Sequence, residues 1–398
     1  MADRAEIPLS LYIHIPWCVR KCPYCDFNSH NAPAELPQRE YVEALLRDLD
    51  ADLPLARSRP LVSIFFGGGT PSLFSPASIA RILDGAAARL AFHADIEITL
   101  ETNPGTVEHG PFADYRRAGV NRISFGVQSF DDEALRRIGR IHGAHEAERA
   151  VKLAQDAGLA DINLDLMYAL PQQTAALALA DVEKALSLQT PHLSHYQLTL
   201  EPNTRFAADP PPLPDDDSAW EIQELCQARL AAAGLHQYEV SAYARAGAEC
   251  AHNLNYWRFG DYLGIGAGAH GKTTDAAGEV RRRWKLRAPR GYLEHAGTAR
   301  GIGGDDAIPA ERLPFEFVLN ALRLNAGFSL ADFTARTGLA ASAITPMLGD
   351  CERRGWLALD RGEVRATELG QRFLNDVIAA FLPEPPRTRR VHGGPPHA

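Results

Sequence analysis

The stretch Cys18-Val-Arg-Lys-Cys22-Pro-Tyr-Cys25 decides how this chain is interpreted, because it places three cysteines at a C-x3-C-x2-C spacing. An ordinary [4Fe–4S] cluster takes four protein thiolates, one for each iron. Three thiolates leave one iron free to bind an exchangeable ligand, much as a catalytic zinc site keeps an open position. The spacing therefore predicts a [4Fe–4S] cluster with one open iron.

Other uses of these cysteines fit the sequence less well. A disulfide framework needs an oxidising compartment, but the chain has six Cys in 398 residues and shows no signal peptide. A structural zinc site needs a fourth ligand at finger or ribbon spacing, and His30, the nearest candidate, lies in a different local pattern. Cys226, Cys250 and Cys351 are scattered and are expected to be ordinary thiols.

Length and composition exclude several classes of protein. A chain of 398 residues with 45% hydrophobic residues is expected to form two domains with a large core. The formal net charge of −9 argues against a nucleic-acid-binding protein. No apolar run approaches the roughly 20 residues that span a bilayer. We therefore expect a cytoplasmic protein, and peripheral association with the inner face of the membrane is left open.

The first half of the chain alternates short β-rich runs with amphipathic helical patterns. Strands are predicted over 9–15, 62–66, 96–100, 121–127, 162–167 and 193–200. Helices are predicted over 41–52, 76–90, 144–157, 175–188 and 220–233. Six consecutive βα units imply parallel strands with right-handed crossovers, but a complete barrel needs eight. We predict an α/β fold built on a partial, laterally open (β/α)6 TIM-like barrel.

Changes in composition and in hydrophobic pattern divide the rest of the chain. The divisions predicted are a barrel core over 1–235, an extension over 236–308, a C-terminal domain over 309–382 and a disordered tail over 383–398. A loop rich in Pro and Asp is predicted over 201–218. In the C-terminal domain, helices over 314–324, 329–337 and 341–354 precede a hairpin over 356–367 and a last helix, which predicts a winged-helix-like arrangement.

Polar and glycine residues follow the predicted strands at the edge where barrel enzymes carry their sites. Gly67-Gly-Gly-Thr-Pro71 ends the second strand, and it lacks the Lys-Ser/Thr ending of a phosphate loop. Its glycines let a ligand approach the main chain closely. With an open iron nearby, we expect this turn to hold the methionyl part of S-adenosylmethionine (SAM), which chelates iron through its amine and carboxylate. Glu101 is then a candidate acceptor for SAM, although a surface carboxylate is at least as good an explanation of that residue alone.

The N-terminal motif, with Tyr24 before its last cysteine, resembles the radical SAM superfamily. Four strings resemble the oxygen-independent coproporphyrinogen oxidase-like group, and within it the heme chaperones: Tyr12-Ile-His-Ile-Pro-Trp-Cys18, Gly67–Pro71, Gly126-Val-Gln-Ser-Phe130 and Ile162-Asn-Leu-Asp-Leu-Met167. The resemblance implies that Cys18, Cys22 and Cys25 bind the cluster. It also implies that the SAM region is lined by Tyr12, Tyr24, Gly68, Gly69, Thr70, Glu101, Gln128, Arg140 and Asp165.

The string His252-Asn253-Leu-Asn-Tyr256-Trp257 matches the H-N-x-x-Y-W motif that the heme chaperones of this group carry. The resemblance implies that His252, Asn253, Tyr256 and Trp257 contact heme. An imidazole can ligate iron, and aromatic faces can stack on the macrocycle. Without the resemblance, an aromatic-rich loop packing over the barrel mouth is the better explanation. The basic string Arg281–Lys285 is interpreted as a solvated strand or loop.

Two departures distinguish the chain from the oxidases of that group. The oxidases continue C-x3-C-x2-C with a further C at the second position, where this chain has Phe27, and they carry a longer N-terminal extension. We therefore expect a heme chaperone that uses the cluster and SAM and transfers heme to an acceptor, such as a membrane respiratory protein. The alternatives are an oxygen-independent coproporphyrinogen III dehydrogenase, a radical SAM oxidative decarboxylase, and a protein whose cluster only stabilises the fold. No catalytic residue is predicted.

Overall fold

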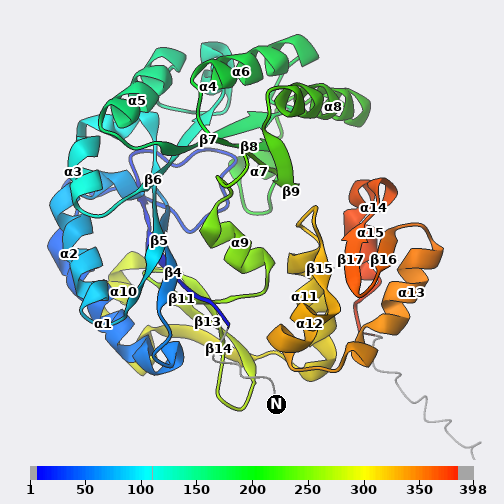
Figure 1. The fold of residues 1–398 in the computed structure, drawn as a ribbon. Coiled ribbons are helices and arrows are strands. Elements are labelled where there is room, and N and C mark those ends of the chain that lie inside the picture. The colour runs from blue at the N-terminus through cyan, green and yellow to red at the C-terminus, as the bar shows by residue number, and fades with distance from the viewer. Residues whose placement is uncertain (1–6, 110, 384–398) are drawn as a thin grey trace, which may run out of the picture.

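The computed structural model describes residues 7–109 and 111–383. Figure 1 shows a curved sheet with helices along its outer face and a C-terminal domain beside its open side. The tail predicted over 383–398 lies outside the described residues except for its first position. Among the helices described, none is long and apolar enough to cross a membrane.

Twelve strands form one sheet in the order β14-β13-β12-β11-β1-β4-β5-β6-β7-β8-β10-β9. Its centre is parallel and follows chain order: β1 (Leu9–Ile15), β4 (Leu61–Gly68), β5 (Phe92–Thr102), β6 (Arg122–Gln128), β7 (Asp161–Tyr168) and β8 (His192–Gln197). These are the six predicted strands, with ends that differ by a few residues. The α/β fold with a partial (β/α)6 barrel is therefore confirmed.

Further strands extend the sheet at both edges, and the sequence patterns did not predict them. A seventh parallel strand, β11 (Asp261–Ile265), pairs with the other side of β1. Antiparallel strands follow it, β12 (His270–Thr274), β13 (Val280–Lys285) and β14 (Ile302–Ala307), while β10 (Ala242–Ala244) and β9 (His236–Glu239) close the opposite edge. These strands are short, and several carry charged residues on both faces, so they lack a period-2 apolar pattern.

Helices cover the outer face of the sheet. The five predicted helices are observed as α1 (Gln38–Ala56), α2 (Pro76–Ala87), α5 (Ala144–Asp156), α6 (Ala175–Ser187) and α8 (Asp216–Ala232), with short unpredicted helices α3 (Phe112–Arg117), α4 (Asp132–Arg137) and α7 (Arg205–Ala208) between them. Helix α2 shows how local sequence sets a boundary. Ser75 accepts a hydrogen bond from the Ser78 N–H, and Pro76 occupies the first turn, where no N–H is needed.

The C-terminal domain has a hydrophobic core of its own. It contains α11 (Leu313–Ala321), α12 (Leu330–Thr337), α13 (Thr345–Arg353), strands β15 (Phe328–Ser329), β16 (Leu357–Asp360) and β17 (Glu363–Ala366), and helices α14 (Glu368–Arg372) and α15 (Leu374–Ala379). The predicted last helix is thus two short helices. Phe317, Phe328 and Phe333 form the centre of this core. The division predicted near residue 309 stays a prediction, which the two separate cores support.

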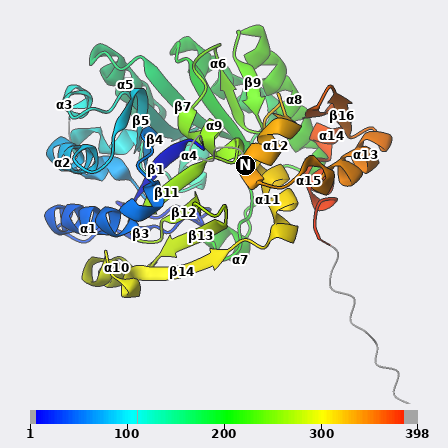
Figure 2. The same ribbon diagram turned by 60° about the horizontal axis from the view of Figure 1, so that its bottom comes forward.

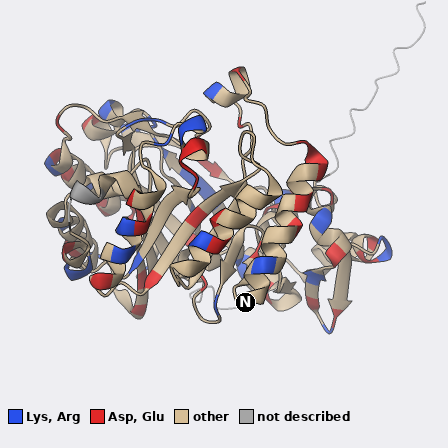
Figure 3. Ribbon diagram, turned by 90° about the horizontal axis from the view of Figure 1, so that it is seen from above, with Lys and Arg blue, Asp and Glu red and all other residues tan. Residues whose placement is uncertain are grey.

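The C-terminal domain lies between the two edges of the open barrel (Figures 1 and 2). On one side, Val280 of β13 and Phe259 belong to its hydrophobic core. On the other side, Leu324 forms an antiparallel bridge with Glu239 at the end of β9. Lys and Arg residues are interspersed with Asp and Glu along the described ribbon in Figure 3.

Buried ion pairs join α1 to β13. The Lys285 Nζ lies 2.6 Å from Asp48 Oδ1 and 2.7 Å from Asp52 Oδ2, and all three side chains are buried. Arg283 adds a contact of 2.8 Å to Asp52 Oδ1. The interpretation of 281–285 as a solvated basic segment is therefore wrong at Lys285, because acidic residues of α1, far away in the sequence, neutralise it inside the fold.

We predict that Lys285→Ala lowers the free energy of unfolding by about 3–5 kcal/mol, because it leaves the buried Asp48 carboxylate without a cation and removes one of the two cations of Asp52. Thermal or denaturant unfolding of the purified protein measures this change. Arg229→Ala is the control, since Arg229 pairs with Glu183 at the surface. That substitution is expected to cost about 1 kcal/mol or less. Equal losses in the two variants would contradict the role given to Lys285.

Candidate functional site

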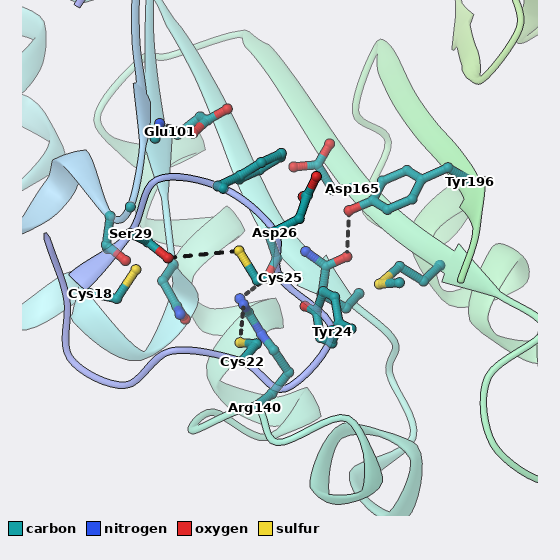
Figure 4. Close-up of a pocket in the computed structure, with 18 of the residues that line it drawn as sticks. Cys18, Cys22, Tyr24, Cys25, Asp26, Ser29, Glu101, Arg140, Asp165 and Tyr196 are labelled. Carbon is teal, nitrogen blue, oxygen red and sulfur yellow. Dashed lines mark hydrogen bonds between the residues drawn. The ribbon is translucent and has the colours of Figure 1, made fainter. Parts of the chain in front are cut away.

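A cavity of about 710 Å³ lies at the carboxyl ends of the parallel strands. Its walls contain all three cysteines of the C-x3-C-x2-C motif, as Figure 4 shows. All but one of the residues predicted for the SAM region also line it: Tyr24, Gly68, Gly69, Thr70, Glu101, Gln128, Arg140 and Asp165. The exception is Tyr12, whose hydroxyl lies 3.1 Å from Nδ1 of His14. The structure thus brings together residues that are more than 140 positions apart in the chain.

The loop after β1 carries the cysteines and is fixed by main-chain hydrogen bonds. Trp17 and Cys18 form the short strand β2 (Trp17–Cys18), which pairs with β3 (His30–Asn31). The Ala32 N–H donates to the Cys18 carbonyl over 2.8 Å, and the Cys25 N–H donates to the Cys22 carbonyl over 3.2 Å. Both ends of the motif are therefore held in place by the protein itself.

The glycine turn after β4 lets this loop pass close to the sheet. A Cβ atom on Gly69 would lie 2.5 Å from the carbonyl oxygen of Trp17, the residue directly before Cys18. Gly68 has φ +113°, and a Cβ there would lie 2.5 Å from the His14 ring. In the same turn the Thr70 N–H donates to the Trp17 carbonyl over 2.7 Å. Only glycine allows this close approach, which positions the first cysteine.

The three thiols are free and face the cavity. An N–H of Arg140 points at Cys22 Sγ over 3.6 Å, and the Ser29 hydroxyl lies 3.9 Å from Cys25 Sγ. Burial raises the pKa of the Cys18 and Cys25 thiols. Their thiolates therefore need a positive partner, and a bound metal centre supplies one.

The arrangement of the thiols suits a cluster better than a single ion. Zinc draws all of its ligands to one point, at about 2.0–2.3 Å from the metal. Within residues 7–109 and 111–383, no three His, Cys, Asp or Glu side chains are placed to hold one metal ion. Cys18, Cys22 and Cys25 instead surround a shared space. In a [4Fe–4S] cluster each thiolate binds a different iron, so the three thiols need not converge on one point.

Two partly buried carboxyl groups form another part of the wall. Glu101 Oε2 accepts from the Gly68 N–H over 3.2 Å, and burial, together with the nearby Asp165 carboxyl, raises the pKa of Glu101 to about 8. Asp165 accepts from Asn163 Nδ2 over 2.8 Å, and burial raises its pKa as well. A cationic ligand in the cavity would stabilise the ionised forms. The wall is therefore suited to bind an ammonium or sulfonium group.

Sequence reasoning missed several residues of the cavity. The Tyr196 hydroxyl donates to Gln128 Oε1 over 2.8 Å, and Ser29, Asn103 and Arg323 also line the space. The position of Tyr196 near the end of the sixth predicted strand was an available signal. No signal in the sequence pointed to Arg323, because this residue comes from the segment that follows α11.

The H-N-x-x-Y-W string lies in helix α9 (Ala251–Trp257) and not in a loop, and none of its four predicted heme residues lines the cavity. His252 is 3% exposed, its Nδ1 lies 2.9 Å from the Ser63 hydroxyl, and its ring stacks on Phe65 at 4.9 Å. Its buried Nε2 has no partner, and burial lowers its pKa to about 3. Tyr256 stacks on Tyr262 at 4.0 Å, and Asn253 is partly buried.

Comparison with known proteins places the chain in a family. Residues 12–183 match the model of the radical SAM superfamily, and residues 308–373 match the HemN C-terminal domain. The chain is 53% identical over 377 residues to the heme chaperone HemW of Escherichia coli, an alignment that covers 95% of this chain and 99% of that protein. The chain belongs to the HemW family. The family resemblance predicted from the motifs is thereby confirmed.

More distant relatives also align over nearly the whole chain. The heme chaperone HemW of Bacillus subtilis is 34% identical, over 94% of this chain and 99% of that protein. The mitochondrial radical S-adenosyl methionine domain-containing protein 1 of Bos taurus is 39% identical, over 94% of this chain and 87% of that protein. The solved structure of coproporphyrinogen III oxidase HemN from Escherichia coli matches with a TM-score of 0.80 at 23% identity, covering 96% of this chain and 91% of that chain, which shows a shared fold.

We predict that Gly69→Ala disrupts the cysteine loop, because the added methyl group meets the Trp17 main chain at 2.5 Å. The expected result is a loss of at least half of the iron bound after anaerobic reconstitution, measured as iron and sulfide per chain. The control is Gly291→Ala in helix α10 (Pro289–His295), where the nearest outside atom lies 3.6 Å from the added Cβ. Full iron content in Gly69→Ala would contradict the close approach described.

Proposed function

We propose that this protein is a heme chaperone, which binds heme and transfers it to an acceptor protein. The proposal includes a [4Fe–4S] cluster on Cys18, Cys22 and Cys25 with exchangeable SAM beside it. The observation that carries it is the cavity that three free thiols and two partly buried carboxyl groups line together. The relatives named heme chaperone HemW, which align over nearly the whole chain, supply the choice of heme.

Each wall of the cavity has a role in this proposal. When bound, the cluster and SAM supply one-electron chemistry at the sulfonium. The cysteines hold the cluster at three irons, and Arg140 places its positive charge beside Cys22. Gly68 and Gly69 make room for the His14 ring and the Trp17 main chain, which keeps the cysteine loop against the turn. Glu101 accepts from the ligand's ammonium group or a ribose hydroxyl. The cavity wall also includes Gln128 of β6 and Asp165 of β7.

Heme binding is assigned to helix α9 because of the motif it carries. The imidazole of His252 is neutral at any physiological pH, since its pKa lies near 3, and its Nε2 has no partner in the fold. A neutral imidazole nitrogen is the form that ligates iron. The ring is packed against Phe65 and Ser63, so ligation by His252 requires that α9 moves away from β4.

We predict saturable binding of one heme per chain when the purified protein is titrated and its Soret band is followed. His252→Ala is expected to shift the band and weaken binding at least tenfold, since an axial ligand is lost. The control is His93→Ala, an exposed histidine of β5 that should leave the spectrum unchanged. Transfer is followed by mixing the heme-loaded protein with an apo-hemoprotein.

Absence of saturable heme binding would contradict the proposed function. Formation of protoporphyrinogen IX from coproporphyrinogen III, with SAM and a reductant under anaerobic conditions, would favour the oxidative decarboxylase instead. Phe27 bears on this alternative, because it lines the cavity and is 59% exposed where the oxidases were expected to carry a cysteine. The cytoplasmic location and a membrane respiratory protein as the acceptor stay predictions.

A further inference from the structure

Arg323 connects three parts of the molecule that the proposed function treats separately. It is the one cavity-lining residue, among those described, that lies beyond residue 201 in the chain. It follows α11 of the C-terminal domain, and its guanidinium lies 4.3 Å from the ring centre of Trp257, the last residue of the H-N-x-x-Y-W string. The cysteine cavity, helix α9 and the C-terminal domain therefore meet at this side chain.

The main chain around Arg323 is anchored to the edge of the barrel. Leu324 bridges to Glu239, and the Asn325 N–H donates to the Tyr238 carbonyl over 3.0 Å. The Asn325 side chain donates to the Gln237 carbonyl over 2.9 Å. These contacts extend strand β9 by a short antiparallel segment. The guanidinium is thus presented to the cavity from a rigid position.

The hydrogen-bonding capacity of Arg323 is largely unused. A guanidinium offers five N–H donors. One Nη2 contact reaches Glu239 over 3.3 Å, while the buried Nε has no partner. Glu239 also accepts from the main chain and hydroxyl of Ser241, over 3.2 Å and 3.1 Å. The side chain of Arg323 keeps 31% of its surface exposed, which leaves its terminal amino groups, rather than the buried Nε, to meet a ligand.

The other cations of the cavity wall also contact protein groups, and the buried Nε of Arg140, like that of Arg323, has no partner. Arg140 is directed at Cys22 Sγ and the Gly126 carbonyl, and Arg20 donates to the Gly139 carbonyl over 2.6 Å. A planar guanidinium with free donors matches a carboxylate, which accepts two parallel hydrogen bonds. The stacked Trp257 ring keeps the guanidinium plane in one orientation.

We propose that Arg323 binds a carboxylate of the ligand in the cavity, and that this carboxylate is a propionate of heme. The inference rests on the proposed heme binding and adds a recognition residue from the C-terminal domain. Heme is favoured over SAM as the source, because Arg323 packs on the helix that carries the heme motif. Trp257 and Glu239 act here as positioning residues that hold the guanidinium.

The test compares heme with heme dimethyl ester, in which both propionates are blocked. Arg323→Gln is expected to weaken heme binding at least tenfold, since a charge-assisted pair is lost, and to leave binding of the ester unchanged. Arg323→Lys should restore part of the loss, because it keeps the charge. The matched control is Arg354→Ala, since Arg354 also stacks on a tryptophan, Trp356, at 4.9 Å, but does not line the cavity. Thermal unfolding of each variant verifies that it is folded.

Three results would overturn the inference. Equal heme affinity in wild type and Arg323→Gln would remove Arg323 from recognition, and an equal loss for heme and ester would make its role structural. If Arg323→Gln weakens SAM but not decarboxylated SAM, the carboxylate belongs to SAM. A wild-type protein that binds no heme would instead refute the proposed function, so the two failures are distinguishable.

Discussion

The close contact between the cysteine loop and the glycine turn after β4 is the constraint on which the site depends. The Trp17 main chain lies so near Gly69 that a single methyl group would not fit between them. Two hydrogen bonds reinforce this contact, from the Gly69 N–H to Ile15 and from the Thr70 N–H to Trp17. Cys18 follows directly, so the position of the first thiol is set by the packing of main chain on main chain.

The rest of the cavity follows from the parallel sheet. Because all the central strands point the same way, their carboxyl ends meet at one edge. There Glu101 and Asp165 lie around the same cavity as the cysteines (Figure 4), which Gln128 also lines. Burial changes the chemistry of this wall, since it raises the pKa of Glu101 to about 8. Because the pKa of Asp165 is raised as well, a positively charged ligand would stabilise the ionised form of both acids.

Much of this site could be predicted because it depends on local order along the chain. Alternating strands and helices determine the barrel, and residues at strand ends converge whatever their sequence distance. Helix α9 could not be placed in this way, since its packing on β4 depends on contacts such as Phe65 with His252. The positions of Arg323 and Lys285 could not be predicted from the sequence for the same reason. Their partners lie on elements more than 60 residues away, and no periodic pattern connects them.

Electron paramagnetic resonance of the reduced, reconstituted protein tests the central claim most directly. We predict a [4Fe–4S] signal that changes when SAM is added, because in the proposed site SAM would bind the iron that has no cysteine. Replacing Cys18, Cys22 and Cys25 together by Ser should abolish the signal, whereas Cys226→Ser, at a buried cysteine outside the cavity, should retain it. A signal that does not respond to SAM, or one that survives the triple substitution, would contradict the three-thiol site.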